Sequence, residues 1–496
     1  MTRIKSNLLA TVCIIMIGLL YQACAVNPVT GKREVMLVSE SQELAMGQQA
    51  DPGIIANFGL YESDVLQSFI NEKGKEMGAI SHRPDLDYQF RILDSPVVNA
   101  FAVPGGYVYF TRGIMAHFNN EAEFAGVLGH EIGHITARHS AAQLSKQQLY
   151  GGLFVAGMIV SEEFRQFGEL GQQALGMMFL KFGRDDESQS DELGVSYSTQ
   201  VGYDSHEMAN FFGVLHRIQQ RAGVNIPEWQ STHPDPVNRF NKVHEMSDAY
   251  QKELGASNLI VGRDSYLKMI DGMIYGDDPK GGYVKYNTFF HPVLKFQFPV
   301  PSQWQVNNTP QMVQMVAPDG KALIMMTLSQ QNTLQAAAQE TVEQDGLEVL
   351  ESSQLNINGL PAYALLSQLA QNTQETQTQT TQPQQDLRIL TYLIQYNGLI
   401  YKFHGLSLAT DFNTYYQTFN NTMGNFNRLT DPARINVSPD VLQIAQVSQA
   451  EALGNALQRM RLSSEDMEEI AILNNMELTD VLQPGMLIKT IRRGTL

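Results

Sequence analysis

The apolar residues in the first half of the chain are spaced mainly as in amphipathic helices. The sequence Ser39-Glu40-Ser41-Gln42 has the form of a capping box and predicts a helix that starts there. Strand-like alternation covers 88–93, and two short strands are predicted within 99–110. A single long helix is predicted from about Asn120 to about Lys146. These signals together predict a mainly helical unit with a small sheet.

Strand signals dominate the second half. Beyond Gly281-Gly282, apolar residues alternate over 294–298, and Asn397-Gly398 between two apolar runs predicts a hairpin with a type I′ turn. Residues 371–385 are almost all Gln, Thr and Asn, and such a composition cannot bury enough apolar surface to fold. We therefore predict an unstructured loop there. Helical spacing flanked by apolar runs returns in 433–496.

The fold class that these patterns predict is α+β, in four segments. They are a signal peptide over 1–23, a mainly helical domain over 24–278, a β-rich α+β domain over 279–432 and a small module over 433–496. The length of 496 residues agrees with several domains. The glycine-rich, apolar stretch 149–183 is predicted to be a buried or lid-like helical pair, with insertion into a membrane interface as the alternative.

The first residues have the form of a secretory signal. Arg3 and Lys5 precede an uncharged apolar run over 8–20, which is too short to span a bilayer but typical of a signal-peptide core. Ala23-Cys24 follows, as a bacterial lipoprotein cleavage site requires, so we predict that Cys24 is lipidated. The alternative is an ordinary signal peptide with an incidental cysteine. The only other cysteine, Cys13, lies inside the signal, so no intramolecular disulfide is expected after cleavage.

The formal net charge of −17 excludes some classes of partner. Phosphate recognition needs a basic surface, so a nucleic-acid-binding protein is not expected. The same charge opposes a peripheral grip on anionic lipid, so membrane attachment is expected through the lipid on Cys24. Residue 25 is alanine rather than the aspartate associated with inner-membrane retention. The chain is therefore expected to be an exported bacterial protein in the periplasm, anchored to the outer membrane.

The strongest chemical motif is His130-Glu131-Ile132-Gly133-His134. In a helix the two histidines lie one turn apart on one face, where both imidazoles can bind one zinc ion. Glu131 then lies beside the metal, placed as a general base for a water molecule that zinc acidifies. A chain of this length contains such a motif by chance in about one or two cases per hundred, so a third ligand is needed.

An acidic run over 184–192 offers that third ligand. Glu187 and Asp191 share a helical face, so if Glu187 binds zinc, Asp191 is placed to hydrogen-bond a ligand histidine. The alternative for this run by itself is the solvated start of a helix.

In combination these motifs resemble the HtpX/BepA-like zinc metallopeptidases, peptidase family forty-eight. The resemblance covers about 27–250 and is much more specific than the histidine motif alone, because several motifs occur in the right order. They are Asn27-Pro28-Val29-Thr30-Gly31-Lys32, the segment from Asn99 to Gly106, Gly129 to His134 with Arg138-His139, Glu187 with Asp191 and Gly194, and Thr232-His233-Pro234-Asp235-Pro236 with Arg239.

The resemblance implies a gluzincin-type zincin fold with one zinc ion per chain. It implies that His130, His134 and Glu187 bind the zinc, that Glu131 is the general base and that Asp191 supports a ligand. It also implies that a strand containing Asn99, Ala100 and Phe101 forms an edge that holds an extended substrate by β-augmentation.

The resemblance further places His233 near the zinc, where it either stabilises the oxyanion or occupies the open coordination position as a latch. Our hypothesis is that His233 binds the zinc directly and holds the enzyme latent. Arg239 is expected to add positive charge at the same oxyanion. His139 lies about 500° around a continued helix from His134, so it is expected to be a structural or surface histidine away from the metal.

We therefore expect a zinc endopeptidase that cleaves misfolded or unassembled envelope proteins. One rival is a chaperone or assembly scaffold whose zinc site is closed by His233 and by the lid predicted over 149–183. A second rival is a wall-binding protein with a structural metal, because 433–496 resembles a degenerate LysM module that would contact peptidoglycan. Outer-membrane assembly proteins are further candidate partners.

Overall fold

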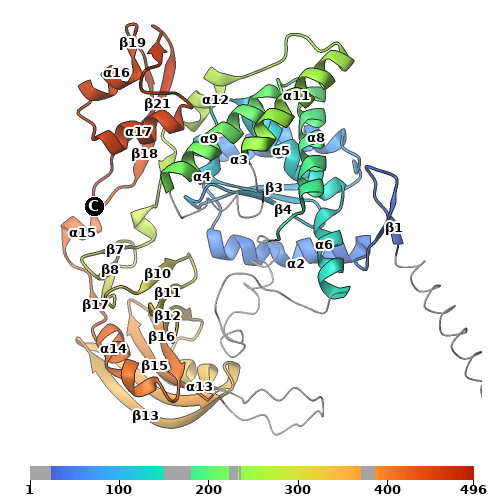
Figure 1. Cartoon of the computed structure of the whole chain (residues 1–496). Coiled ribbons are helices and arrows are strands. Elements are labelled where there is room, and N and C mark those ends of the chain that lie inside the picture. Colours follow the sequence, from blue (N-terminus) through green and yellow to red (C-terminus); the bar gives the residue numbers. More distant parts are fainter. Residues whose placement is uncertain (1–23, 150–179, 223–232, 234–235, 370–385) are drawn as a thin grey trace, which may run out of the picture.

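The computed structural model of the chain describes residues 24–149, 180–222, 233, 236–369 and 386–496 (Figure 1). Three predicted segments therefore lie outside the described residues: the signal peptide 1–23, most of the stretch 149–183, and the loop 371–385. Within the described ranges, no helix is both long and apolar enough to span a bilayer. Helices and strands are mixed, in agreement with the predicted α+β class.

A small mixed sheet underlies the helical region. Its strand order is β3-β5-β4, with β3 parallel and β4 antiparallel to β5. The strands predicted around 88–93 and within 99–110 are thus confirmed. Their bounds are β3 (Gln89–Leu93), β4 (Ala100–Val103) and β5 (Tyr107–Thr111), and the short hairpin that precedes them consists of β1 (Cys24–Val26) and β2 (Arg33–Val35).

Helices cover this sheet in Figure 1. The capping box predicted at Ser39 is confirmed, since its hydroxyl accepts a hydrogen bond from the backbone of Gln42 and the Gln42 side chain accepts one from the backbone of Ser39. The helices are α2 (Glu40–Phe58), α3 (Asp64–Ala79), α4 (Arg112–His117), α5 (Glu121–Thr136), α6 (His139–Leu149), α8 (Arg184–Gln200), α9 (His206–Ala222), α11 (Pro236–Leu254) and α12 (Arg263–Ile270).

The prediction of one long helix from Asn120 to Lys146 is wrong. The helix ends at Thr136 and a new helix begins at His139, because Arg138 between them adopts a left-handed backbone conformation with φ of 61°. The periodicity of the apolar residues continues across the break, so the sequence pattern did not reveal it.

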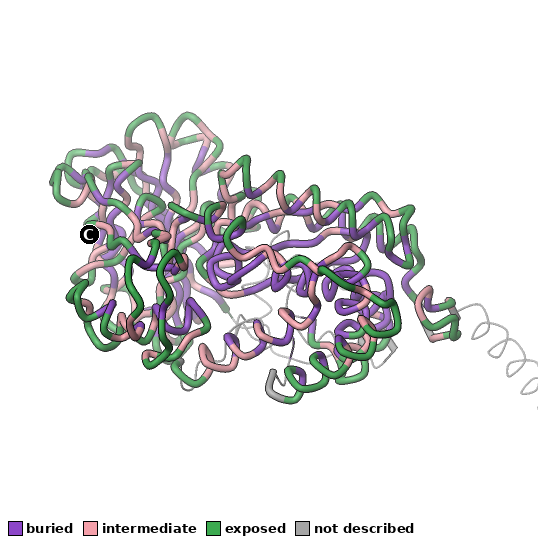
Figure 2. The backbone as a smooth tube through the Cα atoms, turned by 90° about the horizontal axis from the view of Figure 1, so that it is seen from above, coloured by how far each residue is buried: buried purple, intermediate pink, exposed green. Residues whose placement is uncertain are grey.

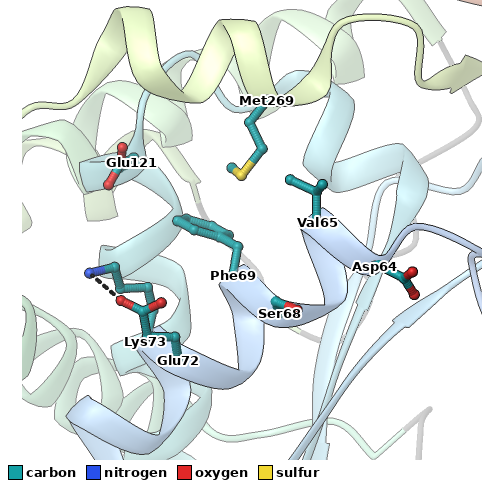
Figure 3. A pocket seen from close by; sticks show the side chains of 8 residues that line it. All are labelled: Asp64, Val65, Ser68, Phe69, Glu72, Lys73, Glu121 and Met269. Carbon is teal, nitrogen blue, oxygen red and sulfur yellow. Dashed lines mark ion pairs between the residues drawn. The ribbon is translucent and has the colours of Figure 1, made fainter.

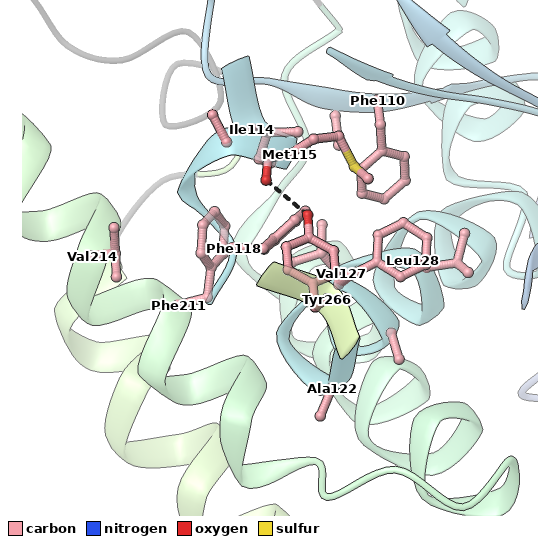
Figure 4. Close-up of a cluster of buried hydrophobic side chains, with 14 of the residues drawn as sticks. Phe110, Ile114, Met115, Phe118, Ala122, Val127, Leu128, Phe211, Val214 and Tyr266 are labelled. Carbon is pink, nitrogen blue, oxygen red and sulfur yellow. Dashed lines mark hydrogen bonds between the residues drawn. The ribbon is translucent and has the colours of Figure 1, made fainter. Parts of the chain in front are cut away.

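Buried aromatic side chains fix α5 in the interior. Phe110, Phe118, Phe211 and Tyr266 surround the helix and are fully buried, and the Tyr266 hydroxyl donates a 2.7 Å hydrogen bond to the carbonyl of Met115 (Figure 4). In Figure 2 the buried backbone accordingly concentrates along the middle of this region. A helix anchored on all sides can hold metal ligands with little freedom of movement.

The β-rich region contains a seven-stranded antiparallel sheet in the order β10-β11-β12-β16-β15-β14-β13 and a four-stranded sheet in the order β17-β9-β8-β7. The predicted hairpin is confirmed: Asn397 and Gly398 have φ of 49° and 78°, as a type I′ turn requires. The elements are β7 (Tyr283–Lys285), β8 (Thr288–His291), β9 (Phe296–Pro299), β10 (Gln305–Asn308), β11 (Val313–Val316), β12 (Ala322–Ser329), α13 (Leu334–Gln344), β13 (Leu347–Ile357), β14 (Leu360–Leu369), β15 (Leu387–Tyr396), β16 (Leu399–Leu408), α14 (Phe412–Gly424), β17 (Asn427–Arg428) and α15 (Pro432–Ile435).

The last segment, residues 433–496, packs against the helical region and does not form a separate unit. Its strand β18 pairs with both β21 and β6 (Ile274–Tyr275), a strand of the first region. Leu442, Leu473 and Ile488 belong to the same buried cluster as the aromatic residues around α5. The elements of this segment are β18 (Asp440–Gln446), β19 (Glu451–Ala452), α16 (Leu453–Arg459), α17 (Ser464–Leu473), β20 (Val481–Leu482) and β21 (Leu487–Arg492).

A buried lysine fastens this segment to the first region. The Lys489 ammonium donates hydrogen bonds to the carbonyls of Ala116, His117 and Phe118, at 3.0, 3.2 and 3.0 Å, where α4 ends. The positive charge also matches the partial negative charge at the end of a helix. Burial lowers the pKa of Lys489, and the Glu123 carboxylate opposes that shift.

We expect Lys489→Met to lower the free energy of unfolding by about 2 kcal/mol, because three buried carbonyls lose their donor. Urea denaturation followed by circular dichroism measures this change. Lys75→Met, at an exposed position of α3, is the matched control and should leave the unfolding free energy unchanged within error. Equal stability of the two variants would contradict a fastening role for Lys489.

Candidate metal centre

The two motif histidines lie on α5, as the sequence predicts. The helix starts at a cap in which the Asn120 side chain accepts a 2.7 Å hydrogen bond from the backbone N–H of Glu123. One turn separates His130 from His134, and both side chains are at most 1% exposed. Their Nε2 atoms lie 3.0 Å apart, so both rings point at one position.

Glycines allow α8 to come close to this face of α5. A Cβ atom on Gly129 would lie 3.0 Å from the backbone of Gly194, and one on Gly133 would lie 3.1 Å from the Cβ of Leu193. Any larger side chain at these positions would push the helices apart. The close packing brings Glu187, in the first turn of α8, to the two histidines.

Four donor atoms converge at this point. They are Nε2 of His130 and His134, an oxygen of Glu187, and Nδ1 of His233, all four residues being buried. The His233 Nδ1 atom lies 3.3 Å from His130 Nε2 and 2.9 Å from Glu187 Oε1. The structure thus brings together the three ligands that the resemblance implies, and His233, which our hypothesis places at the zinc, lies beside them as a fourth donor.

These distances fit a zinc ion. Tetrahedral bonds of about 2.0–2.1 Å place ligand atoms about 3.3 Å from one another. With Oε1 of Glu187 as the carboxylate donor, the separations here run from 2.9 Å to 3.5 Å. Imidazole nitrogens with one carboxylate oxygen form a donor set that zinc prefers.

The buried charges give an independent test of the same fit. Glu131, Glu187 and Asp191 carry three formal negative charges, Arg239 carries one positive charge, and all four are at most 5% exposed. Buried charges persist only when they are compensated. With His233 neutral, as a metal-binding imidazole is, a divalent cation at the four donors would balance the excess of two negative charges.

Asp191 lies behind His130, as predicted. Its Oδ1 atom is 3.0 Å from His130 Nδ1, an arrangement that orients the ring so that Nε2 faces the metal position. Burial alone would raise the pKa of Asp191, but the Arg239 guanidinium and the bond to His130 bring it to about 2. The carboxylate is therefore ionised throughout the physiological range.

Arg239, near the start of α11, contacts both carboxylates of α8. Its Nε donates a 2.8 Å hydrogen bond to Asp191 Oδ2, and its Nη1 lies 3.0 Å from Glu187 Oε2. These contacts favour a role in holding the two acids in place. The predicted role of Arg239 at the oxyanion stays a prediction.

The ionisation states of His130 and His134 suit metal binding. Burial lowers the pKa of His130 to about 4 and that of His134 well below its ordinary value, so both rings are neutral near pH 7. A neutral imidazole is the form that binds a metal. For His233, burial lowers the pKa, but the nearby carboxylates, Glu187 foremost, raise it more.

Glu131 faces the same space without belonging to the four donors. Its Oε1 atom lies 3.8 Å from His233 Nε2, and the side chain is 1% exposed. A carboxylate beside the metal but off it is the position that a general base requires.

The sequence pattern did not reveal the role of His139. This residue is away from the four donors, as expected, yet it is buried, and its Nδ1 lies 3.0 Å from His134 Nδ1. Its Nε2 lies 2.9 Å from Gln189 Oε1 of α8. The angle of about 500° assumed a continuous helix, whereas the turn at Arg138 redirects His139 toward His134.

The predicted substrate strand lies at an edge. Among the strands that the structure describes, β4 pairs with β5 only, and the Asn99 side chain just before it is fully buried. Among the described residues, no hydrogen-bond partner reaches the Asn99 side-chain amide. Binding of substrate by Asn99, Ala100 and Phe101 stays a prediction.

An open cavity elsewhere on the helical region shares no residue with the metal centre. It lies where α3, α12 and the start of α5 meet and is lined by Phe69, Met269 and several polar side chains (Figure 3). This cavity therefore does not mark the metal site. The four donor atoms place that site in the buried centre.

Residues 66–247 match the model of peptidase family M48, a segment that contains every donor of the centre. The chain is 28% identical over 229 residues to the beta-barrel assembly-enhancing protease of Yersinia pestis, covering 45% of this chain and 47% of that protein. It is 27% identical over 263 residues to the protein of that name in Escherichia coli K12, with coverages of 49% and 53%. The mitochondrial metalloendopeptidase OMA1 of Arabidopsis thaliana is 28% identical over 174 residues, with coverages of 35% and 34%. The chain thus spans about half the length, or less, of these curated relatives.

We expect Asp191→Asn to weaken zinc binding by about 10- to 100-fold, because the His130 ring loses the carboxylate that orients it. Competition with a chromophoric chelator measures the affinity. Asp185→Asn, an exposed substitution on the same helix, is the control and should bind zinc like the unmodified chain. Unchanged affinity in Asp191→Asn would show that the carboxylate does not support the ligand.

Proposed function

We propose that this chain, whose residues 66–247 match the model of peptidase family M48, is a zinc-dependent endopeptidase for misfolded or unassembled envelope polypeptides. The observation that carries the proposal is the buried convergence of donor atoms from His130, His134 and Glu187 with the Glu131 carboxylate beside them. A structural site has no need of such a carboxylate.

Zinc bound here supplies Lewis-acid polarisation and lowers the pKa of a water molecule to about 7. Glu131 takes the proton from the attacking water and passes it to the departing amine. Asp191 and Arg239 keep His130 and Glu187 in their orientations while charge changes at the centre. The buried surroundings strengthen each of these interactions.

The edge strand β4 favours the proposal that the substrate is an extended polypeptide. Backbone groups on its free side can pair with a polypeptide in β conformation, which suits unfolded chains because folded proteins seldom present a free strand. The Asn99 side-chain amide, just before this strand, is buried and has no hydrogen-bond partner among the described residues, so we propose that it pairs with the substrate backbone once the substrate is bound.

The cellular setting belongs to the same proposal. We place the protein in the periplasm, held to the outer membrane by a lipid on Cys24. Two relatives bear the name beta-barrel assembly-enhancing protease, which favours outer-membrane assembly proteins as partners. Peptidoglycan contact through 433–496 is a further proposed interaction.

One observation favours a second candidate function. His233 supplies a fourth donor, and a zinc site closed by four protein ligands is typical of a structural role. In that case the chain acts as an assembly scaffold or a wall-binding protein with little proteolysis. Removal of His233 distinguishes the two functions, because it activates a latched peptidase but leaves a structural site inactive.

Glu131→Gln should lower the rate of casein cleavage by at least about 100-fold while zinc stays bound, because only the proton acceptor is lost. Cleavage is followed by release of labelled peptides, and zinc content by elemental analysis. Glu192→Gln, an exposed carboxylate on α8, is the control and should cleave at the unmodified rate. Comparable cleavage by Glu131→Gln would remove Glu131 from the mechanism.

His233→Ala should raise casein cleavage several-fold, because removing the fourth donor opens a coordination position for substrate while three ligands still hold zinc. The same cleavage assay applies, with zinc content measured in parallel. His216→Ala on α9, a partly exposed histidine that is not among the four donors, should have no effect. If His233→Ala retains zinc and cleaves no faster, the latch hypothesis is wrong.

A further inference from the structure

A second group of metal-binding side chains lies between α9 and α11. It consists of His206, the first residue of α9, with His244 and Asp248 one turn apart on α11, and their donor atoms lie within 4.8 Å of one another. His206 Nε2 is 3.0 Å from Asp248 Oδ1, and the rings of His206 and His244 have centroids 4.7 Å apart. The two helices lie side by side in Figure 1.

The hydrogen bond between His206 and Asp204 orients the His206 ring for metal binding. Its Nδ1 atom lies 2.7 Å from Asp204 Oδ1. The same oxygen accepts hydrogen bonds from the backbone of His206 and from the Gln251 side chain, at 3.1 and 3.0 Å. A carboxylate on one ring nitrogen keeps the proton there and leaves the other nitrogen as a ligand, as in many zinc sites.

The donor set decides the class of ion. Two imidazole nitrogens and one carboxylate oxygen suit zinc and its first-row neighbours, whereas calcium and magnesium take oxygen donors. His244 and Asp248 are exposed and His206 is partly exposed, so water can complete the coordination sphere.

We propose that His206, His244 and Asp248 form a second binding site for a divalent transition-metal ion such as Zn²⁺. On binding, the ion replaces the proton that His206 shares with Asp248, and that proton goes to solvent. The ion fastens α11 to α9.

This placement gives the site a consequence for the first centre. Arg239, which contacts Glu187 and Asp191, precedes His244 on α11 by five residues, about 7–8 Å along the helix axis. An ion that holds α11 against α9 therefore steadies the helix from which Arg239 reaches the ligand carboxylates.

The test is a zinc titration of the full chain already carrying one equivalent of zinc, followed by isothermal calorimetry. The unmodified chain should take up one further ion, and excess zinc should raise its melting temperature. His244→Ala and Asp248→Asn should each weaken this second binding step at least tenfold and reduce the rise in melting temperature. His216→Ala and Glu245→Ala, substitutions on the same two helices, should leave both measurements unchanged.

Two results would overturn the proposal: no second binding step in the unmodified chain, or equal second-step binding in His244→Ala. His244 is exposed, so its replacement should preserve the fold, and the circular dichroism spectrum verifies this. Neither measurement uses proteolysis, so the outcome is independent of whether the chain is a peptidase.

Discussion

The close approach of α5 and α8 is the constraint on which the metal centre depends. Gly129 on one helix faces the backbone of Gly194 on the other, and Gly133 leaves room for the Leu193 side chain. Only at this separation do the rings of His130 and His134 meet the carboxylate of Glu187, since a zinc–ligand bond is about 2 Å long. The aromatic residues packed around α5 then prevent the helix from rotating away from that contact.

The metal centre also depends on compensation of its buried charges. The centre gathers three carboxylates and one guanidinium in a region closed to water, an arrangement that is costly without compensation. A divalent cation satisfies the excess negative charge and the open donor atoms together. Metal binding and stability of the site are therefore coupled, because the same buried acids that hold the ion repel one another in its absence.

The last segment of the chain extends this core. After the β-rich region, β18 pairs with β6, and Lys489 reaches the end of α4, just before the helix that carries the histidines. A segment that resembles a separate small module is thus part of the packing that supports the centre. Its buried face is committed to the helical region, so any partner meets its outer face.

The sequence by itself determined the local features: the helix carrying His130 and His134, the acidic helix start at Glu187, the strand after Asn99 and the turn at Asn397-Gly398. Each depends on the spacing or conformation of neighbouring residues. Tertiary structure alone decided that Arg138 turns His139 toward His134 and that His206 meets His244 and Asp248. These contacts join residues on different elements, or depend on one backbone angle, and neither leaves a periodic signal in the sequence.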